Sequence, residues 1–129
     1  MLFRSLIQNV IGSAGNDILV GNGGNVLSGG AGRDLLIAGV SISFLNGGDD
    51  DDILIGGTTD YDNNDAALLA ILAEWANSGT ASLLDTNTVQ SNGGGNGLTG
   101  GDGLDLFFAK FQSEIMDWDP LEDMWVVLP

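Results

Sequence analysis

The residues best suited to chemistry are four aspartates that recur at one position of a short, glycine-rich repeat. Asp17, Asp34 and Asp52 each close a glycine-rich turn, and Asp105 closes a similar turn further along the chain. Calcium prefers carboxylate and backbone carbonyl oxygens, and such turns can aim several of these oxygens at one point. A solvated turn is the alternative for a single aspartate, but three aspartates in register favour metal ligands.

The aspartates belong to units of nine residues. Five consecutive units cover residues 12–55, and two more cover residues 91–108. They read GSAGNDILV, GNGGNVLS, GGAGRDLLI, AGVSISFLN, GGDDDDILI, SNGGGNGLT and GGDGLDLFF. The first six residues of a unit must turn sharply, and the last three form a short strand. A repeat of this kind indicates a parallel β-solenoid.

One residue of each short strand is expected to form the core. Alternate residues of a strand point to opposite faces, so the middle residue of the three points inward. In the first five units that residue is always leucine: Leu19, Leu27, Leu36, Leu45 and Leu54. We therefore expect a leucine-lined core between two thin parallel sheets.

The two sides of this arrangement differ in their acidic residues. Units one, three and five form the odd side and carry Asp17, Asp34 and Asp52 at the sixth position. On the even side, unit four has Ser43 there, and we interpret the eight-residue unit two as having lost its aspartate. We expect two calcium ions on the odd side, one between Asp17 and Asp34 and one between Asp34 and Asp52. The even side should hold none, or one weakly.

One segment has the periodicity of an amphipathic helix. In residues 62–79, Asn63 or Asn64 can cap the N-terminus and Gly79 can end the helix, which predicts a helix over about 64–77. Its apolar stripe consists of Leu68, Ile71, Leu72 and Trp75. The odd sheet has an aliphatic outer face that also needs a cover: Ile18, Val20, Leu35, Ile37, Ile53 and Ile55. We expect the helix to pack on that face, with Trp75 buried and Glu74 pointing away.

The chain is interpreted as one domain in three parts. Residues 1–57 hold an N-terminal segment and the first repeats. Residues 58–90 hold the helix-containing insertion and a linker, and residues 91–129 hold the last repeats and a segment that closes the fold. A length of 129 residues fits a single domain.

Composition excludes several classes of function. The chain has 18 Asp and Glu against 3 Lys and Arg, a formal net charge of −15, which is unsuited to binding nucleic acid. Without Cys or His it has no disulfide, no thiolate metal site and no catalytic triad. Calcium ions are the expected countercharge, and their binding is expected to drive folding. No apolar run is long enough for a membrane span, and residues 1–12 are too weak for a secretory signal peptide.

Three of the units, GSAGNDILV, GGAGRDLLI and GGDGLDLFF, resemble the RTX (repeats-in-toxin, hemolysin-type) nonapeptides of secreted bacterial proteins. The resemblance covers residues 12–57 and 91–108. The tail EIMDWDPLEDMWVVL is similar to the segment that closes many RTX regions ahead of an uncleaved type I secretion signal. The resemblance implies a mainly β fold, a parallel β-roll of nonapeptide repeats, on which the one α-helix of this chain would pack.

The resemblance also implies a ligand set and a function. Calcium would lie between the turns of units n and n+2, bound by the sixth-position aspartate and by turn carbonyl oxygens. The residues implied as ligands are Asp17, Asp34, Asp52, Asp105, Gly12, Ala14, Gly15, Gly29, Ala31, Gly32, Gly47, Asp49 and Asp50. The chain would then be a calcium-binding module of a secreted bacterial protein, located outside the cell or at its surface, that folds on binding calcium there.

A second class of function stays open. The chain could be a self-assembling structural or adhesive component of a surface layer, with self-association or covalent attachment to a larger parent protein. An exposed apolar sheet face would favour this alternative, whereas a helix docked on that face would favour a monomeric module. An enzyme is not expected, because it would need a pair of carboxylates in a cleft outside the repeat turns.

Overall fold

The computed structural model describes residues 2–4 and 9–129, so part of the expected N-terminal segment lies outside the described residues. The single α-helix of the described residues is α1 (Asp65–Ser78), and η1 (Gln112–Glu114) is a short 3-10 helix. The strands are β1 (Leu2–Arg4), β2 (Asn9–Ile11), β3 (Ile18–Val20), β4 (Val26–Gly30), β5 (Leu35–Ile37), β6 (Phe44–Gly48), β7 (Ile53–Ile55), β8 (Gly57–Thr59), β9 (Val89–Ser91), β10 (Gly97–Gly101), β11 (Leu106–Ala109) and β12 (Met124–Val127).

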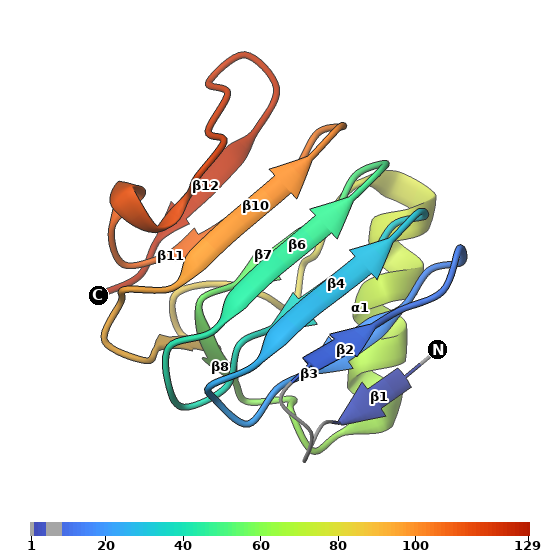
Figure 1. Cartoon of the computed structure of the whole chain (residues 1–129). Helices are drawn as coiled ribbons and strands as arrows, with labels where there is room; N and C mark the ends of the chain where they lie inside the picture. Colours follow the sequence, from blue (N-terminus) through green and yellow to red (C-terminus); the bar gives the residue numbers. More distant parts are fainter. Residues whose placement is uncertain (1, 5–8) are drawn as a thin grey trace.

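Most strands lie in two parallel sheets (Figure 1). The odd-side sheet has the order β1-β3-β5-β7-β11-β12, and the even-side sheet has the order β10-β6-β4-β2. From β1 to β7 each strand joins the sheet opposite to that of the strand before it. The glycine-rich turns between strands carry the chain from one sheet to the other. The expectation of a mainly β chain with parallel sheets and one helix is confirmed.

The space between the two sheets is filled by the residues that the repeat places at the strand centres. Leu19 pairs in register with Leu36, and Leu36 with Leu54; in the other sheet Leu27 pairs with Leu45. These five leucines are 0–2% exposed. Burying a leucine side chain stabilises a fold by roughly 1.5–3 kcal/mol, so these five leucines supply much of the stability of the two stacked sheets.

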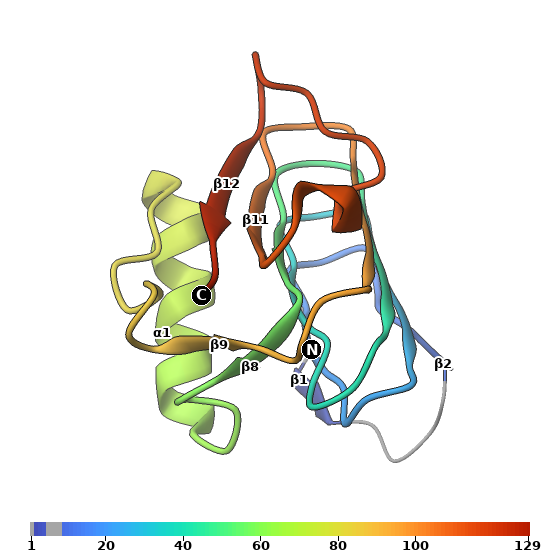
Figure 2. The same ribbon diagram turned by 90° about the vertical axis from the view of Figure 1, so that its left-hand side faces the viewer.

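Helix α1 forms a third layer, outside the odd-side sheet (Figure 2). Asn64 caps its N-terminus by accepting a hydrogen bond from the amide of Ala67, and Gly79 ends it in the left-handed conformation, φ 66°. The apolar stripe of the helix and the aliphatic face of the sheet form one buried cluster. Trp75 is 2% exposed. The predicted packing and burial of Trp75 are therefore confirmed.

Glu74, expected on the helix face opposite the sheet, has partners in the chain that follows the helix. Its carboxylate accepts hydrogen bonds from the hydroxyl of Thr80 at 2.6 Å, the hydroxyl of Ser82 at 2.7 Å and the amide of Ser82 at 3.1 Å. These bonds lower the pKa of Glu74, chiefly through Thr80 and then Ser82. Glu74 thus holds the chain that follows the helix, a role that helical periodicity alone does not reveal.

The segments outside the recognised repeats continue the same architecture. β1 pairs in parallel with β3, and β12 pairs in parallel with β11, so the tail adds a further strand to the odd-side sheet. The insertion leaves the stack through β8 and returns through β9, which pair antiparallel. In the described part of the chain, neither helix has the length and apolarity needed to cross a membrane.

Candidate metal centre in the odd-side turns

The four predicted aspartates lie in one column. We call the turns 12–17, 29–34, 47–52 and 100–105 the odd-side turns. The amide of Asp17 donates to Oδ1 of Asp34 at 2.7 Å, and the amide of Asp34 donates to Oδ1 of Asp52 at 2.8 Å. The amide of Asp52 donates to Oδ1 of Asp105 at 2.9 Å, although 53 residues separate the two in sequence. The carboxylates of Asp34, Asp52 and Asp105 thus each join their own turn to the preceding turn of the column.

The second carboxylate oxygen of three of these aspartates has no hydrogen-bond partner. Oδ2 of Asp34, Oδ2 of Asp52 and Oδ2 of Asp105 are buried and unbonded, and the three residues are 0%, 0% and 1% exposed. Among the described residues these are the only buried side-chain nitrogen or oxygen atoms in that condition. A buried oxygen without a partner costs about 1–3 kcal/mol, and more when it is charged. The three buried oxygens of the column therefore lack the hydrogen-bond donors or cations that would compensate for their burial.

Burial sets the protonation of these groups. It raises the pKa of Asp34 to about 7, that of Asp52 to about 9 and that of Asp105 to about 7, and the charges of nearby aspartates add to the effect. Burial also acts to raise the pKa of Asp17, but hydrogen bonds, including those from Ser13, hold that pKa below its usual value. A cation that replaced the protons would let the three buried groups ionise.

Carbonyl oxygens of the next turn lie beside these carboxylates. A Cβ atom placed on Gly12 would be 2.6 Å from Oδ2 of Asp17 and 2.5 Å from the carbonyl oxygen of Gly29. A Cβ atom on Gly29 would overlap Oδ2 of Asp34 and lie 2.7 Å from the carbonyl oxygen of Gly47. The same pairing occurs around Gly47, between Oδ2 of Asp52 and the carbonyl oxygen of Gly100. The first residue of turns 12–17, 29–34 and 47–52 must be glycine to leave room for both oxygens.

The remaining predicted ligands lie in the same turns but at different depths. Gly15 and Gly32 face each other across adjacent turns, and a Cβ on Gly32 would lie 2.7 Å from the carbonyl oxygen of Gly15. Asp50 has a positive φ of 73°, and its carboxylate accepts a hydrogen bond from the amide of Gly32 at 3.1 Å. The amide of Asp49 donates to the carbonyl oxygen of Gly30 at 2.9 Å. Two further predicted ligands lie on the outer part of the turns, exposed or half-buried: Ala14 and Ala31.

No cluster of acidic side chains forms a metal site by itself. Within residues 2–4 and 9–129, no three Asp or Glu side chains are placed to hold one ion together. The column supplies one carboxylate per turn, and the neighbouring turn supplies carbonyl oxygens. A hard cation that accepts six to eight mixed oxygen ligands, such as calcium, suits this composition better than magnesium, which demands a tight octahedron.

The even side has a polar column too, which corrects the interpretation of unit two. Asn25 occupies the sixth position there, since the next residue of β4 pairs in register with Phe44 of β6. The amide of Asn25 donates to Oγ of Ser43 at 3.1 Å, and the amide of Ser43 donates to Oδ1 of Asn96 at 3.0 Å. The residue missing from unit two therefore lies earlier in its turn. This column is neutral as far as Asn96 and leaves no unbonded buried oxygen among the described residues.

Sequence reasoning missed the acids of the tail that continue both columns. The amide of Asp105 donates to Oδ1 of Asp123 at 3.2 Å, and the amide of Asn96 donates to Oε1 of Glu114 at 3.3 Å. Both pairs are 18 residues apart, twice the repeat period. That spacing was the available signal, but the tail lacks the glycines that mark the other turns. Asp117 accepts hydrogen bonds from the amides that open turn 100–105.

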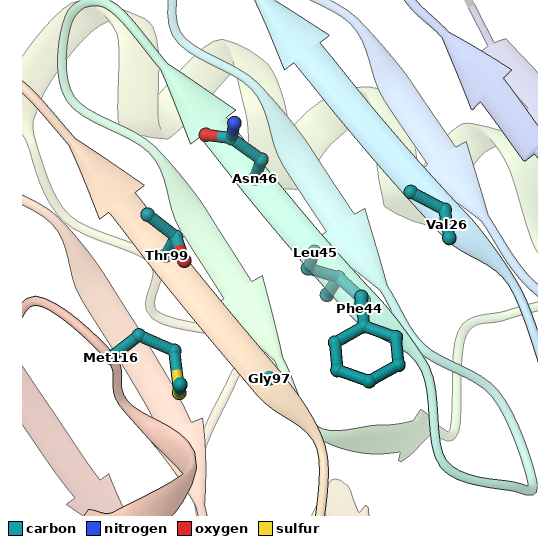
Figure 3. A pocket seen from close by; sticks show the side chains of 7 residues that line it. All are labelled: Val26, Phe44, Leu45, Asn46, Gly97, Thr99 and Met116. Atoms are coloured by element: carbon teal, nitrogen blue, oxygen red, sulfur yellow. The ribbon is translucent and has the colours of Figure 1, made fainter.

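A shallow hollow of about 270 Å³ lies on the outer face of the even-side sheet, away from the aspartate column (Figure 3). Its lining is uncharged and consists of Val26, Phe44, Leu45, Asn46, Gly97, Thr99 and Met116. Phe44 is 59% exposed and Met116 is 67% exposed. Among the residues that the structure describes, no element covers this face in the way that helix α1 covers the odd-side sheet.

Comparisons with protein-family models, with curated proteins and with solved structures each give no match.

Proposed function

We propose that the chain is a non-enzymatic, calcium-binding β-roll module whose folding is coupled to calcium. One observation carries the proposal: Oδ2 of Asp34, Asp52 and Asp105 is buried and has no hydrogen-bond partner. Beside Oδ2 of Asp34 and Asp52 lies a carbonyl oxygen of the adjacent turn. Calcium bound there would supply the missing partner for these oxygens and part of the countercharge for a chain of net charge −15.

The proposed ions lie between successive odd-side turns. The first two would lie between Asp17 and Asp34 and between Asp34 and Asp52. The same juxtaposition of carboxylate and carbonyl oxygens around Gly47 supports a third, between Asp52 and Asp105. The carbonyl oxygens of Gly29, of Gly47 and of Gly100 are the backbone ligands that this geometry favours.

The proposed surroundings of this module are extracellular. Extracellular calcium modules bind in the range of about 10⁻⁴ to 10⁻³ M. The resemblance of the repeats to RTX nonapeptides supports a secreted bacterial protein, exported through a type I system, that folds in the calcium outside the cell. The secreted location and the type I route are parts of the same proposal.

Calcium titration followed by calorimetry and far-UV circular dichroism tests the proposal. We expect cooperative gain of β-structure with calcium, a much weaker response to magnesium, and about two to three ions bound. Asp34→Asn should lose affinity, whereas Glu122→Gln, which removes an equal charge from an exposed position outside the odd-side turns, should not. Identical spectra in chelator and in millimolar calcium, with no heat of binding, would contradict the proposal.

Self-assembly is a second candidate function, because large apolar side chains are exposed on the outer face of the even-side sheet. Val26, Phe44 and Met116 are 47–67% exposed on this face. The docking of helix α1 on the odd-side sheet favours a monomer, but it leaves the even-side sheet open. Light scattering with and without calcium decides the matter. A calcium-dependent increase in mass that Phe44→Ser abolishes would support assembly, and a monomer at both conditions would exclude it.

A further inference from the structure

Arg33 joins the odd-side turns to the C-terminus of helix α1. Its Nη1 donates to the carbonyl oxygens of Trp75 at 3.0 Å and Ala76 at 3.2 Å, and its Nη2 lies 3.0 Å from Oδ2 of Asp51. Its amide donates to Oδ1 of Asn16 at 2.8 Å. A cation at the C-terminus of a helix interacts favourably with the helix dipole. This residue therefore links three structural units: the helix and the turns on both sides of its own turn.

Trp75 and Asp51 form the other half of the same junction. Nε1 of Trp75 donates to the carbonyl oxygen of Asp51 at 2.7 Å, and the ring is 2% exposed. Oδ1 of Asp51 accepts a hydrogen bond from the amide of Leu104 at 2.8 Å, in the next odd-side turn. The helix therefore bonds directly to the backbone of turn 47–52 through a buried indole ring.

These contacts lie next to the aspartate column. Arg33 immediately precedes Asp34, and Asp51 immediately precedes Asp52. The amide of Asp34 donates to Oδ1 of Asp52, which connects turn 29–34 to turn 47–52. The junction with the helix holds these same two turns. A rotation of either turn away from the helix would change where the carboxylates point.

We propose that Arg33, Asp51 and Trp75 form a clamp that positions the odd-side turns for calcium and couples calcium binding to the docking of helix α1. The inference rests on the proposed function of those turns. All three are positioning residues: the clamp acts through the neighbouring aspartates. Binding of calcium would hold the helix against the sheet, and release of the helix would weaken calcium binding, because the coupling between two linked events is reciprocal.

Electrostatics and positioning predict opposite signs for the loss of Arg33. Removal of a cation beside a calcium site lowers the local repulsion and should strengthen calcium binding. Loss of the clamp should weaken it instead. Arg33→Gln removes the charge and its ion pair, and Trp75→Phe keeps an aromatic ring in the core but removes the indole N–H. Lys110→Gln is the matched control, since it removes an equal charge from a position directly after β11, outside the odd-side turns and beside Phe111.

Calcium calorimetry on the full chain is the first measurement. We expect Arg33→Gln and Trp75→Phe each to weaken calcium binding about tenfold, as for loss of a buried hydrogen bond with a charged or aligned partner. The double variant should lose less than the product of the two effects, because the residues act as one unit. Lys110→Gln should bind as well as the wild type or better. Binding of Arg33→Gln that equals or exceeds that of the wild type overturns the clamp.

Hydrogen exchange in saturating calcium separates a local clamp from general destabilisation. We expect Arg33→Gln to speed exchange of the Trp75 indole N–H at least about tenfold while the amide of Leu45, in the even-side sheet, stays protected. Equal loss of protection at both places overturns the clamp, and so do purely multiplicative effects in the double variant. A wild type that binds no calcium refutes the proposed function itself, whereas a wild type that binds calcium beside an unaffected Arg33→Gln refutes only the clamp.

Discussion

Asp52→Asn should change stability in opposite directions with and without calcium. Asp52 is 0% exposed, its Oδ2 has no partner, and burial raises its pKa to about 9. In the metal-free fold at pH 7 the group must therefore be protonated, whereas in the unfolded chain it ionises with a pKa near 3.8. Asparagine has the shape of the protonated group and does not need to take up a proton.

The size of the effect follows from this difference. Between 3.8 and 7 the uptake of a proton costs about 1.36 kcal/mol per pH unit, so the substitution should stabilise the metal-free fold at pH 7 by up to about 4 kcal/mol. Oδ1 can still accept the hydrogen bond from the amide of Asp34, and the carbonyl oxygen of Gly100 lies on the same side of Gly47 as the new amide group. Near pH 4 the gain should almost vanish.

Circular dichroism in chelator, which reports the folded fraction, and thermal unfolding in saturating calcium, both at pH 7 and near pH 4, are the assay. Asp52→Asn should increase the folded fraction in chelator at pH 7 and lower the melting temperature in saturating calcium, since a charged ligand is gone. Asp17→Asn is the matched control in the same column: the pKa of Asp17 is lowered and its carboxylate accepts hydrogen bonds from Ser13, so this variant should lose about 1 kcal/mol in chelator. If Asp52→Asn instead lowers the folded fraction in chelator at pH 7, the buried carboxyl does not destabilise the metal-free fold, and the prediction is wrong.

Three further predictions follow from the same geometry. The metal-free fold should be most stable in acid, because the pKa values of Asp34 and Asp52 are raised in the fold to about 7 and about 9. Such a carboxyl contributes its full stability below its unfolded pKa of 3.8 and loses it as pH rises through its folded pKa. Denaturant melts in chelator from pH 4 to 9 check this, and a stability maximum above pH 7 would contradict it. Gly47→Ala should abolish calcium-dependent folding, since its Cβ would overlap Oδ2 of Asp52. The control Gly15→Ala, whose Cβ would lie 3.7 Å from the nearest atom, should keep the circular dichroism response to calcium. Leu72→Asp should unfold or aggregate the calcium-loaded form, because it places a charge among the buried contacts between helix and sheet. The control Leu69→Asp, at a position 54% exposed, should leave the free energy of unfolding within about 0.5 kcal/mol of the wild type.

The sequence by itself determined the features that depend on a local period. The nine-residue repeat places leucine at the strand centres of the first five units and a sixth-position aspartate in alternate units, and both appear in the fold as predicted. The helix was equally readable, because its cap at Asn64, its stop at Gly79 and its apolar stripe are all defined within one segment. Such features depend on chirality, on side-chain volume and on residues close in sequence, so they need no knowledge of the rest of the chain.

The tertiary structure alone decided which distant groups meet. The insertion leaves the stack through β8 and returns through β9, which brings Asp105 onto Asp52 across 53 residues. The eight-residue unit lacks a residue early in its turn, so Asn25 keeps the sixth position on the even side. The tail, which lacks glycine, supplies Asp123 next to Asp105 at the end of the aspartate column. Only the closed packing shows that Oδ2 atoms are buried without a partner and that Arg33 meets the end of the helix. Burial and long-range contacts of this kind depend on how all the layers close around a group, and a local sequence pattern does not contain that information.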